Sequence, residues 1–229
     1  MSDHPELEWR EGDVPFSPQF NDTYYSKSGG RDETSYVFLK GNGLPERAID
    51  CEHFTIGELG FGTSLNFLET LRQLRAVEHS RRPKLTFISF ELYPMNADQM
   101  EKALRQWPEL SALWRELKSV WSPKQGWNTW ELDGATLLLG VGDANVLLPE
   151  LQGNVDAWYL DGFNPALNKA LWGQELLNSL YSKTKEGGSF ATYTAAGWVR
   201  RNLESAGFDV ERIKGFGHKR EMMRGTKKP

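Results

Sequence analysis

The feature that most constrains this chain is an apolar segment that passes through two closely spaced glycines into a helical pattern. Residues 54–67 read Phe-Thr-Ile-Gly-Glu-Leu-Gly-Phe-Gly-Thr-Ser-Leu-Asn-Phe, and leucines then recur at helical spacing. This order predicts a β-strand, a tight turn and an α-helix. Gly60 and Gly62 allow a sharp turn and leave no side chain between the backbone and a ligand lying across the strand end. The segment therefore predicts a binding site for a small molecule.

Two common nucleotide-binding patterns do not fit this turn. The dinucleotide pattern requires a third glycine at position 65, where this chain has Leu65. The phosphate-binding loop of nucleoside triphosphatases requires Gly-Lys-Ser or Gly-Lys-Thr, which does not follow. Glu58 stands two positions before the first glycine, as in the first motif of S-adenosylmethionine (SAM) methyltransferases, where a carboxylate favours the methionine ammonium. A glycine-rich turn without a ligand is the alternative.

Composition and periodicity predict one soluble α/β domain with an N-terminal extension. The chain has 229 residues, of which 39% are apolar, and it has no apolar run of membrane-spanning length. With Cys51 as the only cysteine and no signal peptide at the N-terminus, we expect a cytoplasmic protein with no membrane partner. Strands alternate with helices over residues 51–229, which predicts a Rossmann-like domain with a mostly parallel sheet and helices on both faces.

Residues 1–50 are rich in turns and aromatic side chains and predict a hairpin or lid, with a strand at 36–39. Residues 107–127 predict a helical and then loop-like insertion. A fifth strand is expected from Ser189, after a glycine pair, and a basic strand-loop-strand is expected at the C-terminal end.

Four carboxylates stand at or near predicted strand ends, where open α/β sheets bind ligands. Glu91 can accept hydrogen bonds from both ribose hydroxyls of a nucleoside, and Asp143 can accept one from the adenine amino group. Asp161 is then left to face the transferable methyl group. Proteins that bind nicotinamide cofactors also use an acidic residue to bind a ribose, so Glu91 alone does not discriminate between SAM and a nicotinamide cofactor. The predicted cofactor-binding residues are Glu58, Gly60, Gly62, Thr63, Glu91, Leu92 and Asp143.

Several longer sequence blocks are more specific than the glycine turn. They include Phe-Ile-Ser-Phe-Glu (87–91), Val-Asp-Ala-Trp-Tyr-Leu-Asp-Gly-Phe-x-Pro (155–165) and Lys-Gly-Phe-Gly-x-Lys-Arg-Glu-Met (214–222), and further blocks lie at 15–26, 33–42, 58–67 and 196–208. Together they resemble the bacterial tRNA 5-methylaminomethyl-2-thiouridine methyltransferases. This family includes the methyltransferase half of the bifunctional MnmC enzyme and stand-alone MnmD-type forms. The resemblance covers nearly the whole chain.

The resemblance implies a class I methyltransferase fold and methyl transfer from SAM to the primary amine of 5-aminomethyl-2-thiouridine at the wobble position of tRNA. The oxidase module that follows the last block in the bifunctional enzyme does not occur in these 229 residues. We therefore expect no FAD, and we expect a separate oxidase or another tRNA-modifying enzyme to supply the substrate.

Asp161 is the expected catalytic residue, since it can hold the acceptor ammonium and aim its nitrogen at the methyl group. An Asp is a poor base unless burial raises its pKa, so we expect orientation and electrostatics to dominate. Phe163 can stack on the splayed uracil ring or simply pack in its loop. Although the net charge is −4, the C-terminal end is locally basic. The residues expected to bind the anticodon loop are Arg200, Arg201, Lys214, His218, Lys219 and Arg220.

Three other functions remain open from the sequence. A small-molecule amine N-methyltransferase or aminopropyltransferase would use the same cofactor pocket and a carboxylate-lined amine site. A non-catalytic SAM- or RNA-binding module would keep the pocket without turnover, and a nicotinamide oxidoreductase would prefer NADH over SAM. No metal is expected, because the four histidines and Cys51 have no metal-ligand spacing.

Overall fold

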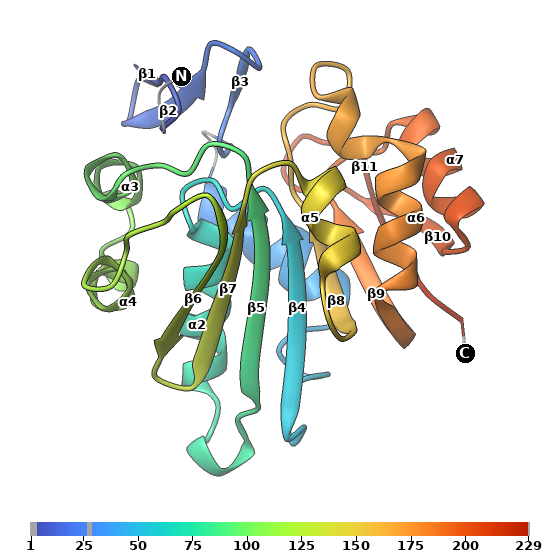
Figure 1. Cartoon of the computed structure of the whole chain (residues 1–229), viewed down its shortest axis with the longest axis horizontal. Coiled ribbons are helices and arrows are strands. Elements are labelled where there is room, and N and C mark those ends of the chain that lie inside the picture. Colours follow the sequence, from blue (N-terminus) through green and yellow to red (C-terminus); the bar gives the residue numbers. More distant parts are fainter. Residues whose placement is uncertain (1–3, 27–28, 229) are drawn as a thin grey trace.

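An eight-stranded sheet organises the chain in the computed structural model, which describes residues 4–26 and 29–228 (Figure 1). In spatial order its strands are β10 (Asp209–Lys214), β11 (Glu221–Thr226), β9 (Thr184–Thr192), β8 (Val155–Leu160), β4 (His53–Leu59), β5 (Lys84–Glu91), β7 (Ala135–Val141) and β6 (Gly126–Leu132). The central strands β9, β8, β4, β5 and β7 are parallel, whereas β11 and β6 run antiparallel to their neighbours in the centre. The predicted mostly parallel sheet is therefore confirmed.

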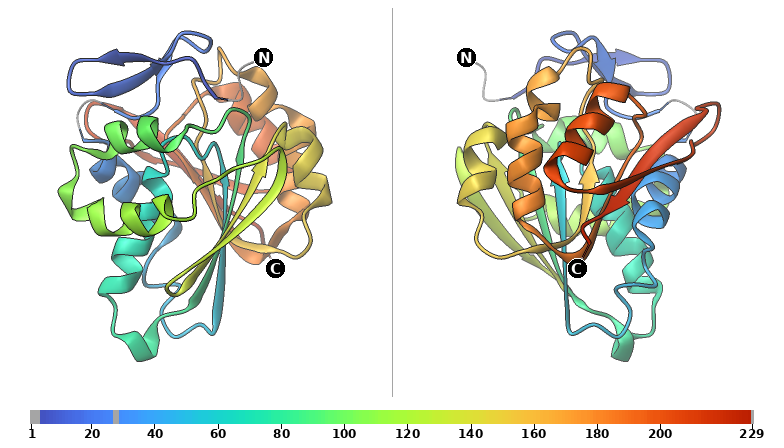
Figure 2. Two further views of the ribbon diagram at one scale, coloured as in Figure 1. Left: turned by 60° about the vertical axis from the view of Figure 1, so that its left-hand side comes forward. Right: turned by 90° about the vertical axis from the view of Figure 1, so that its right-hand side faces the viewer.

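Helices cover both faces of this sheet (Figure 2). One face carries α1 (Gly30–Thr34), α2 (Leu65–Ala76), α3 (Ala97–Leu104) and α4 (Ser111–Lys118), and the other carries α5 (Ala144–Glu150), α6 (Gln174–Ser182) and α7 (Gly197–Ala206). No helix in the described part of the chain is long and apolar enough to cross a membrane.

Successive side chains of the central strands point alternately into two separate hydrophobic cores, because side chains in a β-strand alternate between the two faces of the sheet. In β5, Phe87 packs into the core beneath α2, while Ile88 packs into the core beneath α5 and α6. In β8, Tyr159 and Trp158 divide in the same way. Because both faces of the central strands are buried, their sequences are continuously apolar rather than alternating.

The N-terminal segment forms its own small sheet over the carboxyl ends of the central strands (Figure 1). This antiparallel sheet contains β1 (Glu8–Arg10), β2 (Val14–Ser17) and β3 (Asp22–Thr23), so the predicted hairpin is present. Residues 1–3 and 27–28 of the predicted extension lie outside the described residues.

The strand predicted at 36–39 is wrong. After α1 the chain continues as a π-helical turn, η1 (Ser35–Leu39), and a 3-10 turn, η2 (Lys40–Asn42). Val37, Phe38 and Leu39 are all buried, because this helical segment is enclosed between α2 and β9. A run of consecutive apolar residues fits a buried helix as well as a strand, and here the packing selects the helix.

Two other boundaries differ from the prediction. The loop expected near Trp127 is the edge strand β6, whose side chains alternate between half-buried and exposed as far as Glu131. Strand β9 begins at Thr184 and contains the glycine pair that was expected to precede it. Gly187 has a φ of +70°, and the pairing of β8 with β9 shifts register beside this pair, which is typical of a bulge.

Candidate active site

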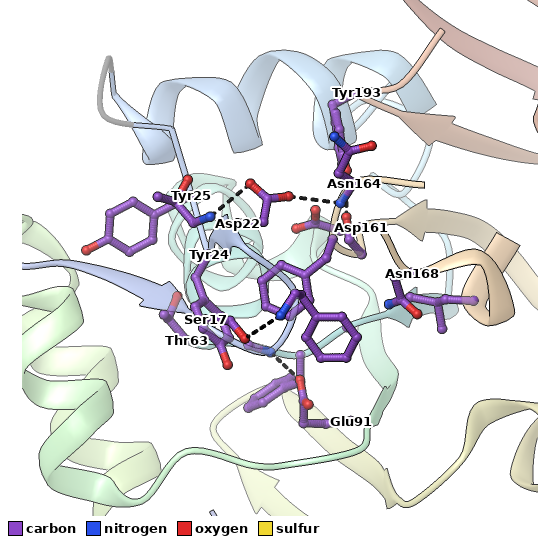
Figure 3. Close-up of a pocket in the computed structure, with 18 of the residues that line it drawn as sticks. Ser17, Asp22, Tyr24, Tyr25, Thr63, Glu91, Asp161, Asn164, Asn168 and Tyr193 are labelled. Carbon is purple, nitrogen blue, oxygen red and sulfur yellow. Dashed lines mark hydrogen bonds between the residues drawn. The ribbon is translucent and has the colours of Figure 1, made fainter. Parts of the chain in front are cut away.

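A cavity of about 1440 Å³ lies at the carboxyl ends of the central strands. Residues that follow β4, β5, β7, β8 and β9 form its floor, and residues 17–26 form part of the opposite wall (Figure 3). Within the sheet, β5 and β7 follow β4 in one direction, and β8 and β9 follow it in the opposite direction. The cavity therefore lies at the point where strand order reverses, which is where open α/β sheets bind ligands.

The glycine turn after β4 forms the centre of the floor. Gly60 has a φ of +90°, and a Cβ atom at this position would stand 2.2 Å from the carbonyl oxygen of Asp161. The backbone N–H of Gly62 points to the next strand end and donates to Oε2 of Glu91 at 2.9 Å. Only glycine allows the turn to approach β8 this closely, so the sequence prediction of a tight turn is confirmed.

Two backbone N–H groups fix the carboxylate of Glu91. Its Oε2 accepts from Gly62, and its Oε1 accepts from the N–H of Tyr93 at 3.0 Å. Burial raises the pKa of Glu91, and these backbone hydrogen bonds oppose that rise. Each carboxylate oxygen can accept further hydrogen bonds, so the side chain can serve two adjacent hydroxyl groups.

Asp143 and Leu92 line the cavity farther along the same edge of the sheet. Asp143 follows β7, and its Oδ1 accepts from the backbone N–H of Asn145 at 2.8 Å. Leu92 is 45% exposed and offers an apolar surface beside it. Three strand spacings separate the ends of β7 and β8, which corresponds to roughly 14 Å. Six of the seven predicted cofactor-binding residues line the cavity, namely Gly60, Gly62, Thr63, Glu91, Leu92 and Asp143.

Glu58 is the exception, because its side chain is fully buried behind the floor and does not line the cavity. Its Oε1 accepts from Nδ2 of Asn66 at 2.9 Å, and its Oε2 accepts from the hydroxyl of Ser89 at 2.7 Å. Burial raises the pKa of Glu58 to about 8. The direct contact with a cofactor ammonium that the sequence suggested is not available to Glu58 in this arrangement.

Asp161 enters the cavity from the end of β8. Its Oδ2 accepts from Nδ2 of Asn66 at 2.7 Å. Burial raises the pKa of Asp161 to about 7, although the hydrogen bond from Asn66 lowers it. A raised pKa is what an aspartate needs in order to accept a proton near neutral pH, and Asp161 has it.

Several polar residues around Asp161 were missed from the sequence. Oδ2 of Asp22 accepts from the backbone N–H of Asn164 at 2.9 Å and ties the N-terminal segment to the loop after β8 (Figure 3). Glu33 pairs with Lys219 at 2.7 Å, and the Lys219 ammonium lies 4.4 Å from the ring centre of Tyr193. Asp22 and Glu33 lie in the blocks at 15–26 and 33–42, so the family resemblance could have identified them as candidate site residues.

Phe163 follows Asp161 in the same loop and already has aromatic partners. Its ring stacks on Phe20 with centroids 4.7 Å apart and meets Tyr24 edge to face at 4.9 Å. The packing role considered for Phe163 is therefore present in the structure. A contact of Phe163 with a substrate base stays a prediction.

The six basic residues expected to bind RNA lie on two parts of the chain. Lys214, His218, Lys219 and Arg220 belong to the hairpin of β10 and β11, and Arg200 and Arg201 belong to α7. Lys219 and Arg220 line the cavity, whereas Arg200, Arg201, Lys214 and His218 do not. Arg200 lies on α7 and pairs with Glu204 at 3.3 Å, and the backbone carbonyl of Lys214 accepts from Tyr36. Binding of RNA by any of the six stays a prediction.

The fold and this site define the class of the protein. Residues 108–228 match the model of the S-adenosyl-L-methionine-dependent methyltransferase family, and the chain belongs to that family. Among curated proteins it is 43% identical over 225 residues to the tRNA 5-methylaminomethyl-2-thiouridine biosynthesis bifunctional protein MnmC of Nitrosospira multiformis, covering 96% of this chain and 36% of that protein. It is 42% identical to the MnmC protein of Aeromonas hydrophila, covering 98% of this chain and 35% of that one. The chain thus spans about a third of the length of these curated relatives.

Solved structures show the same fold. The crystal structure of MNMC2 from Aquifex aeolicus superposes with a TM-score of 0.76 at 22% identity, covering 98% of this chain and 71% of that one. Spermidine synthase from Thermotoga maritima superposes with a TM-score of 0.57 at 13% identity, covering 98% and 72%. The resemblance to the methyltransferase half of MnmC that the sequence indicated is confirmed.

The side chains present fit the cofactor of this family. Glu91 offers a fixed pair of carboxylate oxygens for ribose hydroxyls, and Asp143 offers an acceptor for the adenine amino group. Gly60 lets the turn after β4 lie directly against the backbone of Asp161. Among residues 4–26 and 29–228, no group of three or more His, Cys, Asp or Glu side chains is placed to hold a metal ion. The expectation of a site without metal or FAD stays a prediction.

Proposed function

We propose that this chain methylates the primary amine of 5-aminomethyl-2-thiouridine at the wobble position of tRNA to give 5-methylaminomethyl-2-thiouridine. The observation that carries the proposal is the position of Asp161, whose half-buried carboxylate enters the same cavity as Glu91 but at a different strand end. Asp22 and Glu33 line the cavity beside it. An acceptor that is a cation at neutral pH suits such an acidic environment. The MnmC relatives, which are named for the biosynthesis of this nucleoside, support the proposal.

Bound SAM would supply a methyl group activated by its sulfonium. In the ionised state Asp161 holds the acceptor ammonium by a charge-assisted hydrogen bond, which brings the nitrogen into line for attack. Because the pKa of Asp161 is raised to about 7, the carboxylate can also accept the proton that must leave before the nitrogen lone pair is free. Residues of the N-terminal segment, among them Asp22 and Tyr24, line this end of the cavity.

The anticodon loop is the proposed partner, and Lys219 and Arg220 are the proposed contacts with its phosphates. Both line the cavity at the loop between β10 and β11. Phosphate contacts of this kind weaken as salt rises. A separate oxidase or another tRNA-modifying enzyme would supply the aminomethyl group, and a cytoplasmic location accords with access to tRNA.

The test is transfer of labelled methyl from SAM to bulk tRNA from cells that lack this modification, with mass spectrometry of the nucleosides. We expect 5-methylaminomethyl-2-thiouridine with the wild-type chain and far slower formation with Asp161→Asn. A chain that binds SAM but gives no product on this tRNA would refute the proposed acceptor.

Charge reversal distinguishes a tRNA substrate from a free amine, which the acidic end of the cavity also fits. Arg220→Glu should weaken transfer to tRNA, whereas Arg115→Glu, at an exposed position of α4 outside the cavity, is the matched control. Equal activity of wild type and Arg220→Glu on putrescine or on the free nucleoside, with none on tRNA, would favour a small-molecule transferase. Full biological complementation by Asp161→Asn would favour a binding module, and preference for NADH over SAM would favour an oxidoreductase.

A further inference from the structure

Asn66 makes hydrogen bonds to two carboxyl groups, the buried one of Glu58 behind the cavity and the half-buried one of Asp161 that lines it. It lies on α2, two residues after the turn, and is only 6% exposed. Its Nδ2 donates to Oε1 of Glu58 at 2.9 Å and to Oδ2 of Asp161 at 2.7 Å. A carboxamide nitrogen has two N–H donors, so both are used.

The orientation of this carboxamide is fixed from its other side as well. The hydroxyl of Thr34 donates to Oδ1 of Asn66 at 2.7 Å. A flipped amide would place its oxygen against two carboxylate oxygens and its donors against the Thr34 hydroxyl. The hydroxyl of Thr70 donates to the backbone carbonyl of Asn66 at 2.7 Å, so the residue is held along its whole length.

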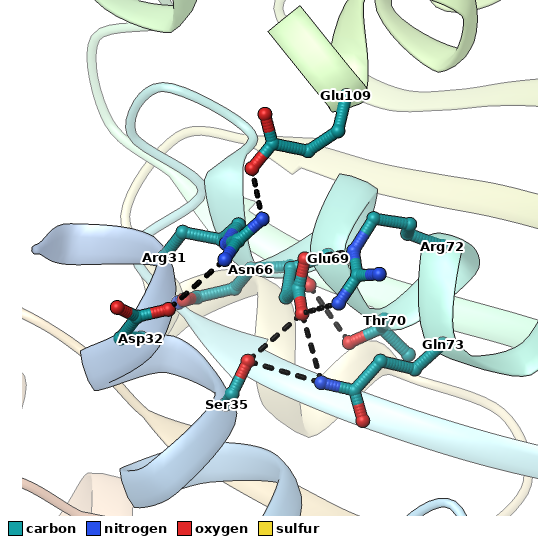
Figure 4. A network of polar contacts seen from close by, with 9 residues as sticks. All are labelled: Arg31, Asp32, Ser35, Asn66, Glu69, Thr70, Arg72, Gln73 and Glu109. Atoms are coloured by element: carbon teal, nitrogen blue, oxygen red, sulfur yellow. Dashed lines mark hydrogen bonds and ion pairs between the residues drawn. The ribbon is translucent and has the colours of Figure 1, made fainter. Parts of the chain in front are cut away.

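The surrounding helices make this arrangement rigid. In Figure 4, Ser35, Arg72 and Gln73 converge on the buried carboxylate of Glu69, one turn along α2 from Asn66. These bonds join α2 to the segment that carries Thr34. The donor that faces Asp161 is therefore held by elements of the scaffold rather than by a mobile loop.

We propose that Asn66 is the positioning residue of the methyl-transfer site, and that Glu58 serves to anchor Asn66 rather than to bind the cofactor. Asn66 holds one oxygen of Asp161 and leaves the other to meet the acceptor amine. Glu58, itself held by Ser89, fixes the second N–H of Asn66. This inference deepens the proposed function, since it identifies the residue that aims the carboxylate on which that function rests.

The hydrogen bond from Asn66 favours the ionised form of Asp161, in opposition to burial. Other titratable groups interact with Asp161 and remain in place when Asn66 is changed. They are Glu58 behind Asn66, Asp22 on β3, Glu33 on α1, Tyr193 after β9 and Lys219 from the loop before β11. Loss of the Asn66 donor alone should therefore move the titration of Asp161 upward.

The test is an NMR titration of the protein labelled with ¹³C at aspartate carboxyl carbons, with the Asp161 signal assigned from its absence in Asp161→Asn. We expect Asn66→Ala to raise the pKa of Asp161 by about one to two units, because a hydrogen bond to a charged group is lost. Asn42→Ala is the matched control, since Asn42 is another buried asparagine that bonds to Phe38, Trp158 and Ser189 and not to Asp161. An unchanged pKa of Asp161 in Asn66→Ala would overturn the proposal.

Two further variants keep the test decisive. Thr34→Val removes the hydroxyl that orients the carboxamide but keeps Asn66, so it should raise the same pKa by a smaller amount even if Asn66→Ala does not fold. Glu58→Gln keeps an oxygen for Asn66 and cannot ionise, so SAM affinity should stay within twofold of wild type. A loss of SAM affinity in Glu58→Gln as large as that in Glu91→Gln would show that the Glu58 carboxyl group binds the cofactor and would overturn the anchoring role.

Kinetics separate a positioning role from a merely structural one. Asn66→Ala should lower kcat by about 10²-fold at saturating SAM, as small misplacements of a reacting group do, and leave the SAM dissociation constant within twofold. It should also move the acid limb of the kcat/KM profile to higher pH. The NMR titration needs no acceptor, so a wrong acceptor would appear as missing product in the wild type, whereas a wrong role for Asn66 would appear as an unmoved titration.

Discussion

Replacing Gly60 by alanine should destabilise the fold and damage the site together. At a φ of +90° the new Cβ would stand 2.2 Å from the carbonyl oxygen of Asp161, whereas real Cβ atoms essentially never approach closer than 3.0 Å. The positive φ costs about 1–2 kcal/mol for an L-residue. Separation of the β4 turn from the β8 backbone costs about 1–3 kcal/mol more, as overpacking does. We expect a loss of about 2–5 kcal/mol, or roughly 4–20 °C in Tm for a domain of this size.

Thermal unfolding and SAM calorimetry measure the two consequences. Gly134→Ala is the matched control, because Gly134 also has a positive φ, +76°, but no atom lies within 4 Å of its added Cβ. The control should lose only the conformational part, about 1–2 kcal/mol, and should bind SAM normally. If Gly60→Ala were no less stable than Gly134→Ala and bound SAM as well as the wild type does, the close approach of the two strand ends would not be the reason for glycine at this position.

The remaining predictions concern Glu91 and Asp161, two of the carboxylates that line the cavity, and the salt dependence of tRNA binding. Glu91→Gln should weaken SAM binding about tenfold or more, since it exchanges an acceptor oxygen for a donor. Asp161→Asn should lower turnover by about 10²–10⁴-fold with little change in SAM affinity. Calorimetry measures the SAM affinity of each variant, and initial rates measure its turnover. Asp161 has a folded pKa of about 7 against an ordinary 3.8, so the stability that its protonated form contributes is complete below about pH 4 and is lost as pH rises through 7. Asp161→Asn should therefore be about 1–3 kcal/mol more stable than wild type at pH 8 and no more stable at pH 4, and the opposite order in thermal melts would contradict the assigned burial. Lys219→Met should reduce the slope of log affinity for tRNA against log salt by about one, and an unchanged slope would exclude a phosphate contact.

The local signals in the sequence were sufficient to predict the central sheet and most of the residues that line the cavity at the ends of β4, β5 and β7. The turn at Gly60 and Gly62, the apolar strands and the acids at their ends are each encoded within a few residues. Because parallel strands bring their carboxyl ends to one edge, side chains such as Glu91 and Asp143 can be placed together without knowledge of their packing. The prediction for these residues required only the order of the elements.

The surroundings of Asp161 in the cavity could not be predicted in this way, since they depend on contacts between distant segments. Asp22 meets the loop at Asn164, and Glu33 meets Lys219, across separations of 142 and 186 residues. No local period reports such a contact. The position of Glu58 behind the cavity could not be predicted for a related reason, because a strand's alternation determines on which face a side chain lies but not whether a helix such as α2 covers it.

The packing of Phe163 against the N-terminal segment restricts access of a substrate base to the part of the cavity near Asp161. One face of its ring is stacked on Phe20 at an interplanar angle of 18°, and Tyr24 occupies an edge-to-face position beside it. A uracil ring can take the stacked position only if Phe20 leaves it, and Asp22, two residues later, is bonded to the same loop. Stacking of a base on Phe163 would therefore require movement of the N-terminal segment, whereas SAM could bind at Glu91 without it. The geometry leads us to expect that Phe20→Ala changes the KM for tRNA and leaves the affinity for SAM unchanged.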